Sequence, residues 1–276
     1  MPLIAGIDCG TNYTKSVVLR HKGTNGAPPQ VIGRGRTRSG VNTDDAATKA
    51  LDEALDRAGV ERSALDYLAT TGFGRYGVSF RDIQVTEITT AARGAHFLNP
   101  GTTTVLDIGG QCTRAVGITE TGKVKQFKSN DKCAAGSGMF IQRAAKYLEI
   151  DLEDVGEMSL RATHPQPISS VCAVLAESEI INHVSAGVSV EDILRGIHES
   201  LADRAGSLLK RVEMKDELTL IGGVARQAGI VKALEDRLKV RVHVPPDCDF
   251  VCALGAALLG LKRLAAKNAA AEMEAK

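Results

Sequence analysis

The sequence repeats one motif, AGIDCGTNYTKSV at residues 5–17 and TVLDIGGQCTRAV at residues 104–116. A shift of 99 positions places Asp8 on Asp107 and keeps a glycine turn and a basic residue in register. Each copy consists of an apolar strand that ends in aspartate, a glycine turn and a second apolar strand, which is the pattern of a β-hairpin. Two copies at a fixed offset predict two related domains that face each other.

Helical and strand patterns alternate along the rest of the chain. Apolar residues recur at helical spacing over residues 44–58, 87–97 and 190–212. An apolar strand is expected over 65–72, where it enters a glycine loop, and the Ala- and Leu-rich segment 253–276 predicts a closing helix. Strands that alternate with helices indicate an α/β fold.

We expect two halves, residues 1–92 with the first hairpin and residues 93–276 with the second. The 276 residues are 43% hydrophobic, which is enough for a well-filled core. Because 34 basic residues balance 33 acidic ones and only 4% are aromatic, neither nucleic acid nor a membrane surface is an expected partner. The sequence shows no leader pattern and no run of about 18 apolar residues, so we expect a cytoplasmic protein.

Both hairpins carry the residue types of a phosphate-binding site. Mg²⁺ prefers oxygen ligands and keeps several waters, so Asp8 and Asp107 at the strand ends are suited to hold it through its hydration shell. The glycine turns present backbone N–H groups to phosphate oxygens, and neighbouring hydroxyl, amide and basic side chains add donors. A third motif, LTLIGGVA at residues 218–225, leads from a buried strand into two glycines and lets the backbone approach a flat ring and a ribose. The predicted nucleotide-binding residues are Gly10, Thr11, Asn12, Thr14, Lys15, Gly109, Gly110, Gly222, Gly223, Val224 and Ala225.

Six cysteines need an explanation in a chain expected to lie in a reducing compartment, where structural disulfides are rare. Cys133 lies in a small-residue loop that opens an apolar helix, and Cys172 begins another helix-like run. A thiolate at a helix N-terminus is stabilised by the helix dipole and by free N–H groups. An iron–sulfur cluster usually takes four cysteines, which a two-fold dimer would supply; two merely buried or reactive thiols are the alternative. The remaining cysteines are interpreted as packing residues: Cys9, Cys112, Cys248 and Cys252.

Several stretches resemble one known family, the BadF/BadG/BcrA/BcrD ATPases. The matching stretches are GIDCGT (6–11), ATTGFGR (69–75), DIGGQ (107–111), NDKCAAGSGMF (130–140), CAVLAESEII (172–181), GIH (196–198) and IGGVA (221–225). They span almost the whole chain, and the two stretches that contain Cys133 and Cys172 are highly specific to that family. The family includes activators of 2-hydroxyacyl-CoA dehydratases and the ATPase subunits of benzoyl-CoA reductase.

The resemblance implies a fold, a site and a function. The implied fold is the actin/sugar-kinase-like fold, with duplicated ribonuclease H-like domains and a nucleotide cleft between them. Asp8 and Asp107 would organise Mg²⁺ and the attacking water, with Gln111 as the third catalytic residue. Cys133 and Cys172 match the family's ligands to one [4Fe–4S] cluster shared by two subunits. The implied task is to take one electron from a ferredoxin-type donor and, through an ATP-driven change of dimer shape, to pass it at low potential to an enzyme acting on a CoA thioester.

One departure from the family leaves several interpretations open. Cys112 stands where the family's second hairpin usually has an aspartate, and this loss would weaken metal positioning or hydrolysis. The stretch 92–100 is closer to the benzoyl-CoA reductase ATPase subunits, which favours a heterodimer with a related chain over a homodimeric dehydratase activator. The alternatives are a small-molecule kinase with Asp82 or Glu87 as base, a non-catalytic ATP-binding partner, and a domain whose glycine loops are only tight turns.

Overall fold

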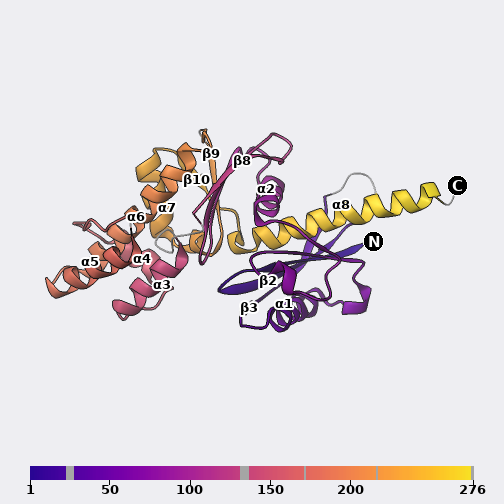
Figure 1. The fold of residues 1–276 in the computed structure, drawn as a ribbon, viewed down its shortest axis with the longest axis horizontal. Helices are drawn as coiled ribbons and strands as arrows, with labels where there is room; N and C mark the ends of the chain where they lie inside the picture. The colour runs from indigo at the N-terminus through magenta and orange to yellow at the C-terminus, as the bar shows by residue number, and fades with distance from the viewer. Residues whose placement is uncertain (23–27, 131–136, 171, 216, 275–276) are drawn as a thin grey trace. The chain divides into compact units, whose positions relative to one another are not determined.

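The computed structural model describes residues 1–22, 28–130, 137–170, 172–215 and 217–274 (Figure 1). The chain divides into two compact units. Unit 1 comprises Met1–Leu98 together with Phe250–Lys276, and unit 2 comprises Asn99–Asp249. None of the described helices is both long and apolar enough to cross a membrane.

Unit 1 is built on a mixed sheet of five strands in the order β3-β2-β1-β4-β5. The strands are β1 (Leu3–Cys9), β2 (Tyr13–Arg20), β3 (Gln30–Arg38), β4 (Tyr67–Thr71) and β5 (Ile83–Gln84). The helices of this unit are α1 (Thr43–Ala58), α2 (Glu87–Leu98) and α8 (Val251–Glu274). β1 pairs antiparallel with β2 and parallel with β4, so the hairpin predicted at residues 5–17 is formed.

The two faces of the first sheet are covered by different helices. Successive residues of a strand point to opposite faces, and β1 divides accordingly. Ala5 and Ile7 belong to a buried cluster with the apolar residues of α1. Ile4 belongs to a second buried cluster with residues of α8, which Figure 1 shows running along the strands of this unit.

Small residues allow α8 to lie very close to the rest of unit 1. A Cβ atom on Gly6 would lie 2.1 Å from the carbonyl oxygen of Ala253, and one on Gly255 would lie 1.9 Å from that of Thr90. The helix predicted over 253–276 is therefore formed, but it packs on the first unit. This arrangement differs from the division expected from the sequence, which assigned that helix to a second half beginning at residue 93.

Unit 2 repeats the topology of unit 1 around a sheet in the order β10-β9-β6-β7-β8. Its strands are β6 (Thr104–Ile108), β7 (Thr113–Ile118), β8 (Val124–Ser129), β9 (Glu217–Ile221) and β10 (Arg241–His243). β6 pairs antiparallel with β7 and parallel with β9, as β1 does with β2 and β4. The sequence repeat therefore corresponds to a structural duplication.

The helices described in unit 2 include a long one and several short ones. They are α3 (Gly138–Tyr147), α4 (Val155–Leu160), α5 (Ala173–Ser185), α6 (Val190–Lys210) and α7 (Ala228–Leu238). The side chains of α3, α5, α6 and α7 share one apolar core with β6 and β9. α6, predicted over 190–212, begins at an N-cap serine, Ser189, whose hydroxyl accepts from the Asp192 N–H.

Candidate functional site

The first hairpin places a buried carboxylate beside a lysine. Asp8, near the end of β1, is 9% exposed, and its register partner on β2 is Lys15. The Lys15 Nζ lies 3.0 Å from Asp8 Oδ2. The hydroxyl of Ser39, which follows β3, donates to the carbonyl oxygen of Gly10 in the turn at 2.6 Å and lies 2.9 Å from the Thr14 hydroxyl. The predicted residues of this hairpin therefore lie at the adjoining ends of β1 and β2 and in the turn between them.

The second hairpin reproduces this arrangement in unit 2. Asp107 is 6% exposed near the end of β6, and its register partner on β7 is Arg114. The Arg114 guanidinium lies 3.4 Å from Asp107 Oδ2. The Gly109 N–H donates to the carbonyl oxygen of Cys112 at 2.9 Å, which closes a turn that leaves Gln111 exposed.

A glycine with positive φ lies directly behind each carboxylate. Gly72 follows β4 with φ of 88°, and Gly222 follows β9 with φ of 94°. A Cβ atom on Gly72 would lie 2.6 Å from Asp8 Oδ1, and one on Gly222 would lie 2.7 Å from Asp107 Oδ1. Only glycine combines this backbone conformation with so close an approach. The sequence predicts Gly222 as a site residue, but it predicts Gly72 only as part of a glycine loop. The feature that could have identified Gly72 is its position at the end of an apolar strand, which it shares with Gly222.

The loop after β9 is fixed at its first residue and open at its second. The Gly222 N–H donates to the carbonyl oxygen of Cys248 at 3.0 Å, and a 3-10 turn follows over Gly223–Arg226. Among the described residues, no atom lies within 4 Å of the position of a Cβ on Gly223, whereas Val224 and Ala225 are buried. The loop therefore presents an open backbone stretch anchored by apolar side chains, as a flat ring and a ribose would require.

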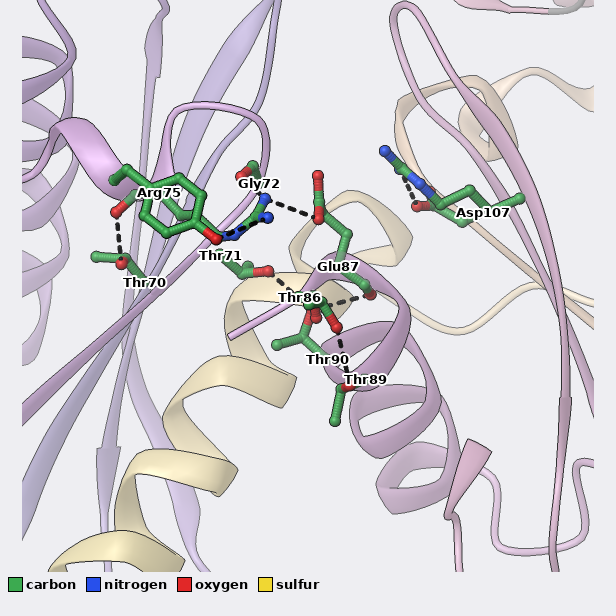
Figure 2. A network of polar contacts seen from close by, with 11 residues as sticks. Thr70, Thr71, Gly72, Arg75, Thr86, Glu87, Thr89, Thr90 and Asp107 are labelled. Carbon is green, nitrogen blue, oxygen red and sulfur yellow. Dashed lines mark hydrogen bonds and ion pairs between the residues drawn. The ribbon is translucent and has the colours of Figure 1, made fainter. Parts of the chain in front are cut away.

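The two carboxylates considered as a kinase base are already engaged. Glu87 Oε2 lies 3.1 Å from the Arg75 guanidinium, which also donates to the carbonyl oxygen of Gly72 at 2.9 Å. Figure 2 shows this guanidinium beside the Glu87 carboxylate. Asp82 Oδ2 accepts the Leu68 N–H at 2.7 Å. Arg75 thereby links Glu87 to the backbone of Gly72, which lies against Asp8. This contact gives Glu87 a structural role in place of that of a catalytic base.

The cysteines fall into buried and partly accessible groups. Burial, aided by the negative charge of Asp8, raises the pKa of Cys9 to about 12, and burial raises the pKa of Cys248 to about 11. Cys252 is buried as well, so these three fit the predicted packing role. Cys112 and Cys172 are half-buried, and Cys172 is the N-cap residue of α5. Cys133, the other predicted cluster ligand, lies outside the described residues.

The predicted site residues thus form one group in each unit. Asp8 and the residues of the first turn lie in unit 1, and Asp107, the second turn and the Gly222–Ala225 loop lie in unit 2. Among the residues that the structure describes, no three His, Cys, Asp or Glu side chains converge to hold a metal ion. Each group offers one carboxylate and one basic side chain, a set suited to a hydrated cation bound with phosphate.

Comparison with known proteins decides the family. The model of the BadF/BadG/BcrA/BcrD ATPase family matches residues 5–260. The chain belongs to this family. It is therefore an ATPase, and the resemblance seen in the sequence motifs is confirmed.

Two relatives with assigned functions are similar over nearly their whole length. The activator of lactoyl-CoA dehydratase from Anaerotignum propionicum is 40% identical, and the match covers 92% of this chain and 95% of that protein. A benzoyl-CoA reductase subunit from Thauera aromatica is 39% identical, with 95% of this chain and 94% of that protein covered. Family membership therefore supports an activator-type ATPase, and the two identities are almost equal.

Solved structures confirm the fold. The activator of the 2-hydroxyisocaproyl-CoA dehydratase from Clostridium difficile, with bound ADPNP, superposes with a TM-score of 0.90 at 34% identity and covers 96% of this chain and 97% of its own. A ROK family glucokinase from Streptomyces griseus shares only the fold, with a TM-score of 0.57 at 12% identity, covering 94% and 99%. The predicted actin/sugar-kinase-like fold is thus confirmed.

Proposed function

We propose that this chain is an ATP-hydrolysing activator that delivers low-potential electrons to an enzyme acting on a CoA thioester. The observation that carries the proposal is the duplicated acidic hairpin, in which each carboxylate has the same basic partner position and the same glycine behind it. A turn that binds no ligand has no need of a buried carboxylate, a basic side chain and a positive-φ glycine, and here all three occur in both hairpins. The related dehydratase activator with bound ADPNP supports ATP as the ligand.

Each kind of residue in the two groups has its own task in this proposal. Lys15 and Arg114 offset phosphate charge, while the turn N–H groups and hydroxyls bind phosphate oxygens. Asp8 and Asp107 would hold Mg²⁺, which would supply neutralisation of the phosphate charge. Gln111, exposed on the second turn, orients the attacking water. The Gly222–Ala225 loop receives the adenosine.

The iron–sulfur part of the proposal rests on Cys172 and Cys133. Cys172 fits a cluster ligand because it is half-buried at the N-terminus of α5, where first-turn N–H groups lack intrahelical partners. A [4Fe–4S] cluster held by both cysteines from each of two chains would supply a one-electron carrier. The proposed donor is a ferredoxin-type protein, and the partner is the CoA-thioester enzyme.

Iron content and ATPase activity test the proposal together. Anaerobically purified protein should contain about two irons per chain, as expected for one [4Fe–4S] cluster per dimer. Asp107→Asn should lower ATP turnover at least about tenfold, roughly 1.4 kcal/mol of barrier, and spare the iron. Cys133→Ser should remove the iron and spare ATP turnover. Folded protein that stays iron-free both alone and together with a related second subunit would sink the electron-transfer function. Near-normal turnover of Asp107→Asn would sink the proposed metal site.

For the partner enzyme, we propose a benzoyl-CoA reductase, on the sequence of residues 92–100. A homodimeric activator of a 2-hydroxyacyl-CoA dehydratase is the second candidate, favoured by the 40% identity to the lactoyl-CoA dehydratase activator. Mass measurement of the anaerobic protein separates them. A chain that holds about two irons as a homodimer favours the dehydratase activator, whereas a chain that binds iron only with a related second subunit favours the reductase.

A further inference from the structure

Strand β8 forms one edge of the second sheet, where it pairs antiparallel with β7. In an antiparallel pair, every second residue bonds to the neighbouring strand, and the residues between them direct their N–H and C=O groups away from it. The Asn130 N–H donates to the carbonyl oxygen of Thr113 at 2.9 Å, and in the observed register Lys128 is the next residue that bonds inward. The backbone groups of Phe127 and Ser129 are therefore directed to the open edge.

The first unit covers the corresponding groups of its own edge strand, β3. The Arg36 N–H donates to Glu53 Oε2 at 2.7 Å, and the Arg34 carbonyl oxygen accepts from the Arg57 guanidinium at 3.1 Å. Both of these side chains belong to α1. Native proteins commonly cover edge strands in this way, because uncovered backbone groups bind further strands. Two edge groups of β3 are thus occupied from within unit 1.

The sequence repeat makes Ser129 the counterpart of Arg36. Arg36 pairs with Lys15, and Ser129 pairs with Arg114, which lies 99 positions after Lys15. By the same shift, Phe127 is the counterpart of the other covered position on β3. Among the described residues, no side chain bonds to the outward backbone groups of Ser129 or Phe127. The duplication therefore gives one covered edge and one open edge at equivalent positions.

The side chains of the open edge favour an acidic strand that also carries an apolar residue. The segment KVKQFKS at 123–129 has three lysines and no acidic residue, although the whole chain has a net charge of only +1. Phe127 is 47% exposed, and Lys125, on the same face of the strand, is exposed as well. Pairing β8 with β8 of a second copy would gather the lysines of both chains, and like charges on neighbouring strands are destabilising. Carboxylates on the added strand would instead offset these charges.

We propose that β8 is a strand-addition site for an extended, acidic segment of a partner protein. The segment bonds to the outward N–H and C=O groups of Phe127 and Ser129, with an apolar side chain opposite Phe127 and a carboxylate beside Lys125. In strand addition, main-chain hydrogen bonds give affinity and alternate side chains give specificity. None of the residues that this segment contacts has a role in the proposed function, so the two proposals can fail separately.

Peptide binding to the full-length, anaerobically purified protein tests the proposal. The probe is the peptide TTEVTEV with blocked ends, whose central valine and two glutamates fit antiparallel pairing with residues 124–130. TTKVTKV is the charge-reversed control. TTEVTEV should bind with a Kd below about 1 mM, and TTKVTKV should bind at least about tenfold more weakly. At saturating TTEVTEV, hydrogen exchange of the Phe127 and Ser129 amides should slow about tenfold, whereas the inward amide of Lys128 should not change.

Two matched pairs of variants test the backbone and the side chain separately. Ser129→Pro removes an outward N–H and should weaken TTEVTEV binding at least about tenfold, whereas Ser129→Ala keeps this N–H and should stay within about threefold of the wild type. Phe127→Glu keeps the backbone and places a carboxylate against an acidic peptide, so it should weaken binding at least about tenfold. Phe127→Leu, which stays apolar, should change binding by less than about threefold. The Phe127 pair tests the proposal even where Ser129→Pro does not fold.

Three outcomes would overturn the proposal. The first is wild-type protein that does not bind TTEVTEV, or that binds both peptides equally. The second is binding that leaves exchange of the Phe127 and Ser129 amides unchanged, which would show a contact between charges without strand addition. The third is slow exchange of these two amides in the free protein that becomes faster on dilution, because the edge would then be occupied by a second copy of this chain.

Discussion

Gly72 and Gly222 support the two acidic side chains from behind, and each tolerates only a hydrogen as side chain. A methyl group on Gly72 would lie 2.6 Å from Asp8 Oδ1 and 2.6 Å from the carbonyl carbon of Cys9. The carboxylate or the strand end must then move, and catalytic groups displaced by about 1 Å lose much of their effect.

We therefore expect Gly72→Ala to lower ATP turnover at least about tenfold, measured as kcat on folded protein. Gly59→Ala is the matched control. Gly59 also has a positive φ, 63°, but no atom of the described part of the chain lies within 4 Å of its Cβ position. The substitution Gly59→Ala should therefore cost only about 1 kcal/mol of stability. Equal turnover in both variants would show that Gly72 does not position Asp8.

His198 gives the protein a pH-dependent stability. It is fully buried, with Nδ1 2.9 Å from the Ser159 hydroxyl and Nε2 3.0 Å from Gln227 Oε1. Burial lowers the pKa of His198 from 6.5 to about 4. Between these two values the unfolded chain binds the proton and the folded chain does not, so protonation favours unfolding.

The free energy of unfolding should therefore be highest above about pH 6.5 and fall as the pH approaches 4, by at most about 3 kcal/mol from this group. Urea unfolding of wild type and His198→Gln at about pH 7 and about pH 5 measures the difference. The variant should lose less stability on acidification. The same loss in both proteins would assign the pH dependence to other groups.

Among the individual residues of the candidate site, the sequence predicts Asp8, Asp107 and Gly222, but it does not predict a role for Gly72. The two hairpins superpose at a shift of 99 positions, whereas Gly72 and Gly222 are 150 positions apart. The difference arises because helices α3 to α6 are inserted between the second hairpin and β9. A single offset cannot align both features, and only the parallel pairing of β4 with β1 and of β9 with β6 makes them equivalent.

Among the elements, edge strand β3 is protected by side chains of α1. The Arg36 N–H donates to Glu53 Oε2 at 2.7 Å, and the Arg34 carbonyl oxygen accepts from the Arg57 guanidinium at 3.1 Å. Glu53 and Arg57 also pair with each other. These side chains occupy backbone groups that a further strand would otherwise bind, and free edges promote association.

Removing this protection should cause self-association. The double variant Glu53→Ala with Arg57→Ala should lose about 1 kcal/mol of stability and show more species larger than a dimer by light scattering. The control is Lys49→Ala with Asp52→Ala, which removes one charge of each sign from the same helix. Identical scattering from both double variants would mean that the edge is not what limits association.

Long elements were predicted with little error, whereas the two shortest strands, β5 and β10, were not predicted. The patterns at 44–58, 87–97 and 190–212 correspond to α1, α2 and α6 within two residues at each end. β5 has two residues and β10 has three, which is too few for any periodicity to show. They form because a neighbouring parallel strand provides an edge to pair with. This pairing depends on the tertiary structure and leaves no local pattern in the sequence.

For the whole molecule, unit 2 is one continuous segment, whereas unit 1 is completed by a helix from the far end of the chain. The Ala- and Leu-rich pattern of α8 predicts a helix but not its partner, because such a surface fits many apolar faces. Close approaches at particular glycines make the choice. A Cβ atom on Gly94 would lie 2.2 Å from the carbonyl oxygen of Val251. The two helices α2 and α8 can therefore approach this closely only where a glycine leaves room for the backbone of the other helix.

Unit 1 should therefore depend on α8, and unit 2 should not. In residues 1–98 alone, the face of Ile4, Val17 and Leu19 has lost the helix that covers it, including Leu254 and Leu258. Burying a leucine contributes about 1.5–3 kcal/mol, and a small domain is stable by only about 5–15 kcal/mol.

We expect residues 1–98 to show no cooperative thermal transition by circular dichroism. Residues 1–98 joined by a flexible linker to 250–276 should melt cooperatively, because the helix then covers the apolar face again. Residues 99–249 should melt cooperatively without α8, since the core of this unit, as far as its residues are described, contains no side chain of α8. A cooperative transition in 1–98 alone would mean that α2 and the first sheet suffice, and that α8 serves the assembled chain rather than the folding of unit 1.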